Sequence, residues 1–412
     1  MNSIKTIFLC LVILMLLVGG VSYAGTYLDS AHGNSTYGVD RTVIDAKYDD
    51  YCSGNCAHCH EAHASLGGDE PLPNTSTAEG PDEVLLFSEE ESVCETCHDG
   101  NPAADNIQAQ IDKTYAHPTD DYSGVHKVSE STTADMDPGD YDATNSLHAE
   151  CVDCHNPHAA GSTVHTAETN TVTATSPLYK VSGVNPPSTA AWVTPAAASY
   201  TEKPTSTGIS FEYELCYKCH SSWTGPNDPV IRDTAKEFNP ANASYHSVEE
   251  TGKASSYGTY VNHWNKDSLM YCSDCHGSEI SSDPAGPHGS IIAHILKGNY
   301  NRDTGKSSLK TSGHLCFDCH DYQTYKAAGT NLGGSGFAEL GYDNLHTIHN
   351  DAVCMDCHSA LPHGINRKHL IVLTKDNADY INGAKIMSFT NVDDRTYSKS
   401  NCSTTIGCHS KK

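Results

Sequence analysis

The hydrophobic and polar positions of this 412-residue chain show little long-range periodicity. One apolar run, Ile7–Val18, lies near the amino terminus. Helical patterns are short, and Glu89–His98 and Glu212–His220 are the clearest of them. Two further apolar runs, Leu370–Leu373 and Lys385–Phe389, are spaced like the strands of a small hairpin. The pattern therefore predicts mostly irregular coil with short helices and a few short strands.

Turn-forming residues recur throughout the chain, which is typical of loops. Only 37% of the residues are hydrophobic, with 7 Phe and 3 Trp, and this is little material for a side-chain core. Large apolar cofactors supply the missing buried surface in some proteins. We therefore expect one elongated domain over residues 25–412, wrapped around bound groups without conventional layers of secondary structure.

A five-residue motif, Cys-x-x-Cys-His, occurs seven times and accounts for 14 of the 18 cysteines. It is the attachment signature of a c-type haem, in which the two thiols bond the porphyrin and the histidine becomes the proximal iron ligand. A stretched eighth copy ends the chain, so we predict eight haems, or seven if this copy is empty. The predicted attachment residues are Cys56, Cys59, Cys94, Cys97, Cys151, Cys154, Cys216, Cys219, Cys272, Cys275, Cys316, Cys319, Cys354, Cys357, Cys402 and Cys408. The predicted proximal ligands are His60, His98, His155, His220, His276, His320, His358 and His409.

Two other interpretations of the cysteines are weaker. A disulfide framework suits an exported chain, but it does not explain a histidine after every second cysteine. Structural zinc needs a fourth ligand at each motif. At Cys402 and Cys408 a disulfide or a pair of free thiols stays open as an alternative. Cys52 has no assigned partner and is close enough to compete with Cys56 in a wider attachment loop.

Histidine is in surplus, because the chain has 25 and eight suffice as proximal ligands. An electron carrier has both axial positions of its iron filled, and a second histidine does this. The best distal candidates follow the odd-numbered motifs, and the others lie upstream of them. The followers are His63, His158, His288 and His363, and the upstream candidates are His32, His126, His246, His263 and His349.

The followers suggest four successive haem pairs, over approximately residues 25–147, 148–262, 263–345 and 346–412. Since His158 comes three residues after His155, one segment can ligate two different haems. His58, inside the first attachment loop, and His165 are expected not to be ligands. The less favoured candidates are His117, His148, His294, His314, His346 and His369.

Residues 1–24 have the features of a secretory signal peptide, with Lys5 before the apolar run and small residues up to Ala24. An uncleaved anchor is the alternative. The net charge of −26 argues against nucleic acid and anionic membranes as partners. We therefore expect an exported protein that is extracellular, at the cell surface or periplasmic.

Two segments, Gly25–Thr36 and Gly54–Ser65, closely resemble the start of the extracellular multihaem c-type cytochrome filament (nanowire) family, typified by outer-membrane cytochromes E and S. Cys154–His158 is similar to motifs of that family, and elsewhere only the haem motifs match. The resemblance implies stacked bis-histidine haems and head-to-tail polymerisation into conductive filaments. It also implies that one distal histidine, here His63, ligates a haem of the neighbouring subunit.

These observations predict an electron-transfer protein rather than an enzyme. Its partners are expected to be other copies of itself, upstream donor cytochromes and extracellular electron acceptors. A monomeric periplasmic or surface shuttle shares every motif and remains an alternative. A multihaem reductase is a third reading, but such enzymes often replace one proximal histidine with lysine, and no Cys-x-x-Cys-Lys occurs here.

Overall fold

The computed structural model describes residues 24–42, 44, 51–60, 90–119, 149–163, 168–224, 232–253, 257–301, 314–325, 334–339, 344–349 and 351–405. Most of this chain is irregular, and its longest helices have nine residues. The helices are α2 (Ala24–Asp29), α3 (Glu90–His98), α4 (Gln108–Ile111), α5 (Cys151–Cys154), α6 (Glu212–His220), α7 (Thr234–Phe238), α8 (Tyr322–Tyr325) and α9 (Leu345–Ile348). The strands are β1 (Tyr115–Ala116), β2 (Gly183–Asn185), β3 (Thr201–Lys203), β4 (Ser244–Tyr245), β5 (Gly289–Ser290), β6 (Gly364–Ile365), β7 (Ile386–Phe389) and β8 (Cys402–Thr404).

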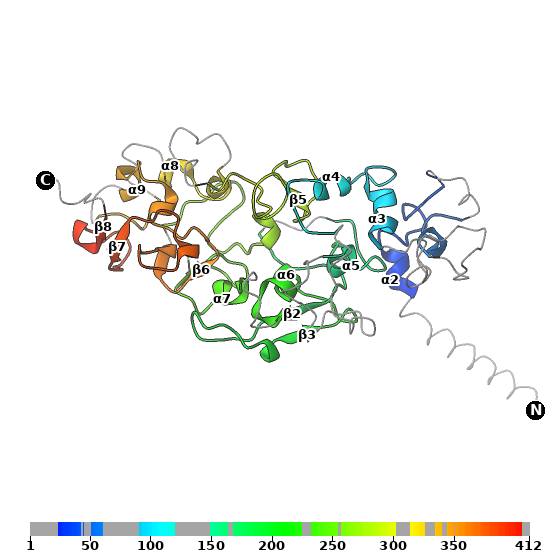
Figure 1. Cartoon of the computed structure of the whole chain (residues 1–412), viewed down its shortest axis with the longest axis horizontal. Coiled ribbons are helices and arrows are strands. Elements are labelled where there is room, and N and C mark those ends of the chain that lie inside the picture. The colour runs from blue at the N-terminus through cyan, green and yellow to red at the C-terminus, as the bar shows by residue number, and fades with distance from the viewer. Residues whose placement is uncertain are drawn as a thin grey trace, which may run out of the picture.

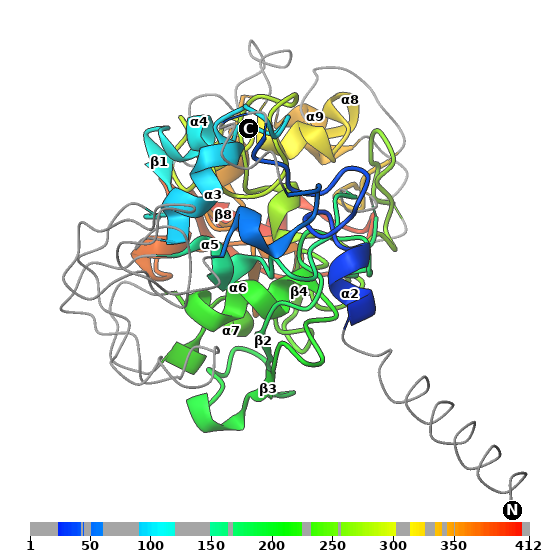
Figure 2. The ribbon, with the colours of Figure 1, turned by 90° about the vertical axis from the view of Figure 1, so that its right-hand side faces the viewer.

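The molecule is elongated, and the chain advances broadly along its long axis. Figure 1 shows α2 and α3 at one end, α5, α6 and α7 in the middle, and α8, α9, β7 and β8 at the other end. Viewed along the axis (Figure 2), α4, α8 and α9 lie on one side and α6, α7, β2 and β3 on the other. Successive cysteine motifs are therefore distributed along the length of the molecule in sequence order.

All described strands form two-stranded antiparallel ribbons. Two of these ribbons join segments far apart in sequence, β1 with β5 and β4 with β6. The hairpin expected between Leu370–Leu373 and Lys385–Phe389 is wrong, because β7 pairs with β8. The first of these runs instead packs side chains of Ile371 and Leu373 against Ile386.

The predicted helices over the second and fourth motifs are confirmed as α3 and α6. Around α6 and α7 lies the largest apolar cluster of the described residues. Two acidic residues in the first turn of α6 stabilise the helix by interacting favourably with its dipole. The members of the cluster are Val184, Tyr200, Tyr213, Tyr217, Trp223, Ala235, Phe238, Val248 and Met270. Side-chain packing is thus concentrated in the middle of the molecule.

Gly364 permits β6 to lie directly against the end of α7. A Cβ atom added at Gly364 would lie 1.9 Å from the carbonyl oxygen of Glu237, well inside van der Waals contact. The same close approach occurs in the β1–β5 ribbon, where a Cβ at Gly289 would lie 1.9 Å from the carbonyl oxygen of Gln110. Glycine is therefore required at both positions to seat the ribbon on its neighbouring helix.

We predict that Gly364→Ala destabilises the folded protein by about 1–3 kcal/mol or more, because the added methyl group overlaps backbone. The matched control is Gly252→Ala, whose Cβ would meet its nearest neighbours at an ordinary 3.7 Å. Thermal unfolding of the two purified variants measures the difference. Equal midpoints for Gly364→Ala and Gly252→Ala would contradict the close contact.

Candidate metal centres

The cysteine motifs fold as tight turns that gather two thiols and an imidazole. In the turns ending at His60, His155 and His276, the histidine N–H donates to the carbonyl of the first cysteine at 2.9–3.0 Å. An aspartate inside the motif caps several turns by accepting from the backbone N–H that precedes the first cysteine. This bond is 2.9 Å at Asp153 and 2.8 Å at Asp274. Local sequence alone therefore fixes the attachment geometry.

Each of the seven described proximal histidines faces a second imidazole from another part of the chain. The ring centroids in these pairs are 5.9–6.3 Å apart. In motif order the pairs are His60–His158, His98–His32, His155–His288, His220–His117, His276–His363, His320–His246 and His358–His346.

This separation fits two axial ligands on one metal ion. A metal–imidazole bond is about 2 Å long and the nitrogen lies about 1 Å from its ring centroid, so opposite ligands have centroids about 6 Å apart. The donor set, two imidazoles beside two thiols on one turn, is also that of a c-type haem. The described residues therefore fit the predicted cofactor.

Burial keeps several of these imidazoles neutral, which is the form that binds a metal. It lowers the pKa of His288 to about 3 and those of His220 and His276 to about 4. Backbone carbonyls orient several of the rings by accepting from Nδ1. His155 donates to Pro177 at 3.1 Å and His358 to His369 at 2.7 Å. The Nε2 atom of each ring is then the one left to ligate.

The distal histidines of different centres are joined by backbone ladders. The N–H of His117 donates to the carbonyl of His288 at 3.2 Å, and that of His246 to the carbonyl of His363 at 2.8 Å. A side-chain hydrogen bond joins the same two segments as the first of these, because His117 Nδ1 donates to the Pro287 carbonyl at 2.8 Å. His32 bonds the Pro157 carbonyl, next to His158, in the same way at 3.0 Å. Each ribbon thus positions ligands for two centres at once.

Neighbouring centres follow one another in motif order. A hydrogen bond with Cys272, together with burial, raises the pKa of Cys216 well above its usual value, so thiols of the fourth and fifth motifs touch. The same contact links Cys316 of the sixth motif with Cys354 of the seventh. None of the described cysteines forms a disulfide. At these two junctions the cysteines of successive motifs therefore lie close together.

The structure places most distal candidates in these pairs. His32, His158, His246, His288 and His363 each face a proximal histidine. His263 instead packs its ring on Trp264, with centroids 4.8 Å apart. Opposite His358 stands His346 and not His349, whose Nδ1 bonds the carbonyl of Leu345 at 2.7 Å. Five predicted positions lie outside the described residues, namely His63, His126, His148, Cys408 and His409.

From the sequence, His117 and His346 are among the less favoured distal candidates, whereas the structure places each of them opposite a predicted proximal histidine. A usable signal for His117 was the preceding alanine, since Ala116-His117 repeats Ala31-His32. His346 is selected by α9 and by a 2.9 Å hydrogen bond between its Nδ1 and Ser335 Oγ, which no local motif reveals. His58 was expected not to be a ligand. It is fully buried, and backbone groups of Arg41 and Cys52 occupy its two ring nitrogens.

No protein-family model, curated protein or solved structure matches the chain. In the part of the chain that the structure describes, no helix has the length and apolarity needed to cross a membrane. Nor do the described His, Cys, Asp and Glu side chains form a group of three or more that could hold a bare metal ion. Each imidazole pair supplies only two ligands, so a metal held there would need further ligands from outside the described side chains, and the four nitrogens of a porphyrin would meet that need.

We predict that His288→Ala leaves one iron with an open axial position, because His288 alone faces His155. The reduced variant should bind carbon monoxide at one haem and show a high-spin component in its absorption spectrum. His263→Ala is the matched control and should bind none, since His263 packs on Trp264. Carbon monoxide binding by the second variant and not the first would reverse the ligand assignment.

We also predict two kinds of ferric low-spin signal in the electron paramagnetic resonance spectrum. The ring planes are close to parallel in His60–His158 (8°) and His358–His346 (12°), and strongly crossed in His98–His32 (77°). Parallel ligand planes split the iron orbitals into a rhombic pattern, whereas crossed planes give one very anisotropic signal. A spectrum with a single class of signal would contradict these geometries.

Proposed function

We propose that this protein is a multihaem c-type cytochrome that carries electrons along a row of bis-histidine haems. The observation that supports this most directly is the set of seven imidazole pairs at metal-spanning distance, each beside its own pair of thiols. A bound haem supplies reversible one-electron chemistry at iron. The protein contributes the attachment thiols, the two axial imidazoles and the spacing of successive sites.

Electron transfer fits the described sites better than catalysis does. A reductase binds its substrate at an iron with an open or weakly held position, whereas each of the seven described sites offers two imidazoles. Thiol contacts such as that of Cys216 with Cys272 bring neighbouring sites edge to edge, which suits rapid transfer between them. The second candidate function is a monomeric shuttle, which uses the same row of sites without assembly.

We infer further that copies of the chain join head to tail into an extracellular filament. The followers obey a register, because His158 faces His60, His288 faces His155 and His363 faces His276. Each follower thus serves the odd-numbered site before its own. By this register His63, which follows the first motif, has no site in its own chain. We propose that it ligates a haem near the carboxyl-terminal end of the adjacent subunit.

The elongated shape supports this arrangement, since the first and last described motifs lie toward opposite ends (Figure 1). Electrons would then pass along successive subunits from donor cytochromes to acceptors outside the cell. The proposed signal peptide and the strongly acidic composition agree with an exported protein that does not bind nucleic acid. The resemblance at Gly25–Thr36 and Gly54–Ser65 supports the same assembly.

Electron microscopy of haem-staining material sheared from cells tests the assembly. We predict filaments from the wild-type chain and separate particles from His63→Ala, because that variant lacks the shared ligand. The His63→Ala particles should keep their low-spin haems apart from one with an open position. His165→Ala, which removes a histidine expected to be solvated, should still form filaments. Filaments of normal length from His63→Ala would exclude the shared ligand, and particles from the wild type would favour the shuttle.

A further inference from the structure

One axial imidazole has a hydrogen-bond partner of a different chemical kind. His363 Nδ1 lies 2.7 Å from Oε2 of Glu237, whereas the Nδ1 partners found at other paired rings are backbone carbonyls or, at His346, a serine hydroxyl. Among the described residues it is the only axial imidazole hydrogen-bonded to a carboxylate. Since Nδ1 faces an acceptor, it carries the proton and Nε2 is directed to the metal.

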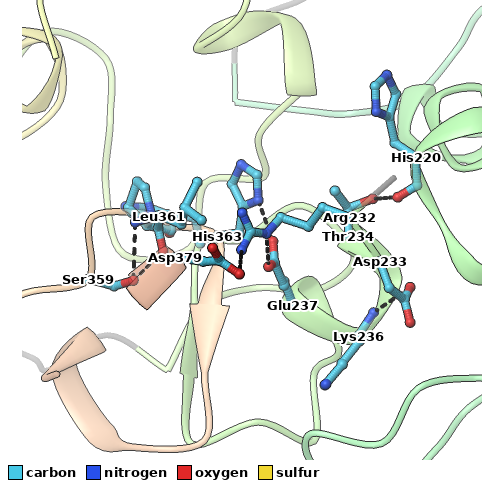
Figure 3. A network of polar contacts seen from close by, with 12 residues as sticks. His220, Arg232, Asp233, Thr234, Lys236, Glu237, Ser359, Leu361, His363 and Asp379 are labelled. Atoms are coloured by element: carbon cyan, nitrogen blue, oxygen red, sulfur yellow. Dashed lines mark hydrogen bonds and ion pairs between the residues drawn. The ribbon is translucent and has the colours of Figure 1, made fainter. Parts of the chain in front are cut away.

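Glu237 is built into this position. Its side chain is 1% exposed and lies on α7, whose end is pressed against Gly364 next to His363. Figure 3 shows the carboxylate between His363 and Arg232. The Arg232 Nε donates to Oε1 at 2.7 Å, and the Tyr380 hydroxyl donates to the same oxygen at 2.7 Å. The arginine and these donors hold the group as a buried carboxylate, so Oε2 is left for the imidazole.

The ring of His363 is also held at a larger angle to its partner than the rings of the other two described followers. The other follower pairs, His60–His158 and His155–His288, have ring planes 8° and 29° apart. The His276–His363 planes are 58° apart. The ring of His363 packs on Phe238, with centroids 4.7 Å apart, while Glu237 fixes its Nδ1. Two adjacent residues of α7 thus determine both the orientation and the hydrogen bonding of this ligand.

A carboxylate that accepts from the outer nitrogen of a ligating imidazole gives the ring imidazolate character and makes it a stronger donor to the metal. Stronger donation stabilises ferric iron relative to ferrous iron, which lowers the reduction potential of the site. Carbonyl and hydroxyl acceptors are neutral and have a smaller effect. Resting on the function proposed above, we propose that Glu237 makes the haem ligated by His276 and His363 the lowest in potential of the seven paired sites.

Glu237 is a positioning residue in this scheme, because it acts on the metal only through His363. Three variants separate its charge from its shape. Glu237→Gln keeps an oxygen acceptor and removes the charge. Tyr380→Phe removes one competing donor and leaves the carboxylate more basic toward His363. Glu214→Gln is the matched control, since Glu214 is also 1% exposed and paired with a cation, Lys203, without touching an imidazole.

The test is a spectroelectrochemical titration of the purified holoprotein, with electron paramagnetic resonance of samples poised at low potential. In the wild type, the last haem to be reduced should give the signal of crossed ligand planes. Glu237→Gln should move this most negative component, one haem in amplitude, to higher potential. Tyr380→Phe should move it lower, and Glu214→Gln should leave it in place.

Opposite shifts from Glu237→Gln and Tyr380→Phe support the proposal. If one variant folds poorly, the direction of the shift in the other, compared with the wild type, still tests it. An unchanged lowest component in Glu237→Gln, with all haems still low-spin, would show that the carboxylate is only structural. Shifts of one sign in both variants would also overturn it. A wild-type protein without bis-imidazole haems would instead overturn the proposed function itself.

Discussion

Pairing an imidazole from each attachment turn with one from a distant segment is the constraint on which the rest of this structure depends. The hydrogen bonds that orient the distal rings of His32, His117 and His246 join residues 125, 170 and 116 positions apart in the chain. The strands at the His117 and His246 junctions have two residues each, and at the His32 junction a backbone hydrogen bond from Ala31 N–H to the Ala160 carbonyl joins the two segments. Such short pairings are marginal by themselves. Metal ligation at each pair, as proposed, would close loops that the backbone ladders alone hold weakly.

The same constraint explains which features could be read from the sequence. The attachment turns are local, so their cysteines, their histidines and the two nine-residue helices α3 and α6 follow from short patterns. The followers were recognisable because proline or a small residue flanks each of them. The assignment of these histidines as ligands remains a prediction, although the structure places three of them opposite proximal rings.

Local sequence patterns could not decide which of several neighbouring histidines faces a proximal ring. His117 faces His220 because β1 pairs with β5, and that partner strand lies far along the chain. The expected hairpin failed for a related reason. The backbone of the run at Leu370–Leu373 hydrogen-bonds to the seventh motif, where Val372 N–H donates to the Cys357 carbonyl. That leaves β7 to pair with β8 instead. Tertiary pairing, and not intrinsic preference, decides such short strands.

The middle of the molecule is where side-chain packing and ligand geometry meet. The segment between the fourth and fifth motifs supplies α7, and α7 contacts sites on both sides. Its Thr234 hydroxyl donates to the carbonyl of His220, the proximal ligand of the fourth site, while its Glu237 holds the distal ligand of the fifth. The same helix contributes Ala235 and Phe238 to the largest apolar cluster. Neighbouring sites are therefore coupled through one rigid turn as well as through their thiols.

A row of sites with similar reduction potentials passes electrons in either direction with equal ease. Differences in potential between sites therefore decide how electrons move along the row. Six of the fourteen paired rings hydrogen-bond neutral backbone carbonyls, and such neutral partners have similar effects on the potentials of their sites. A single buried carboxylate behind one ligand breaks this uniformity at the fifth of the motifs, near the middle of the row. On the function and the low potential proposed above, an electron crossing the subunit would meet its highest energy step at this site, between two halves of lower energy. Because the site lies in the best-packed region, the fold would set the height of this step and shield it from solvent and partners.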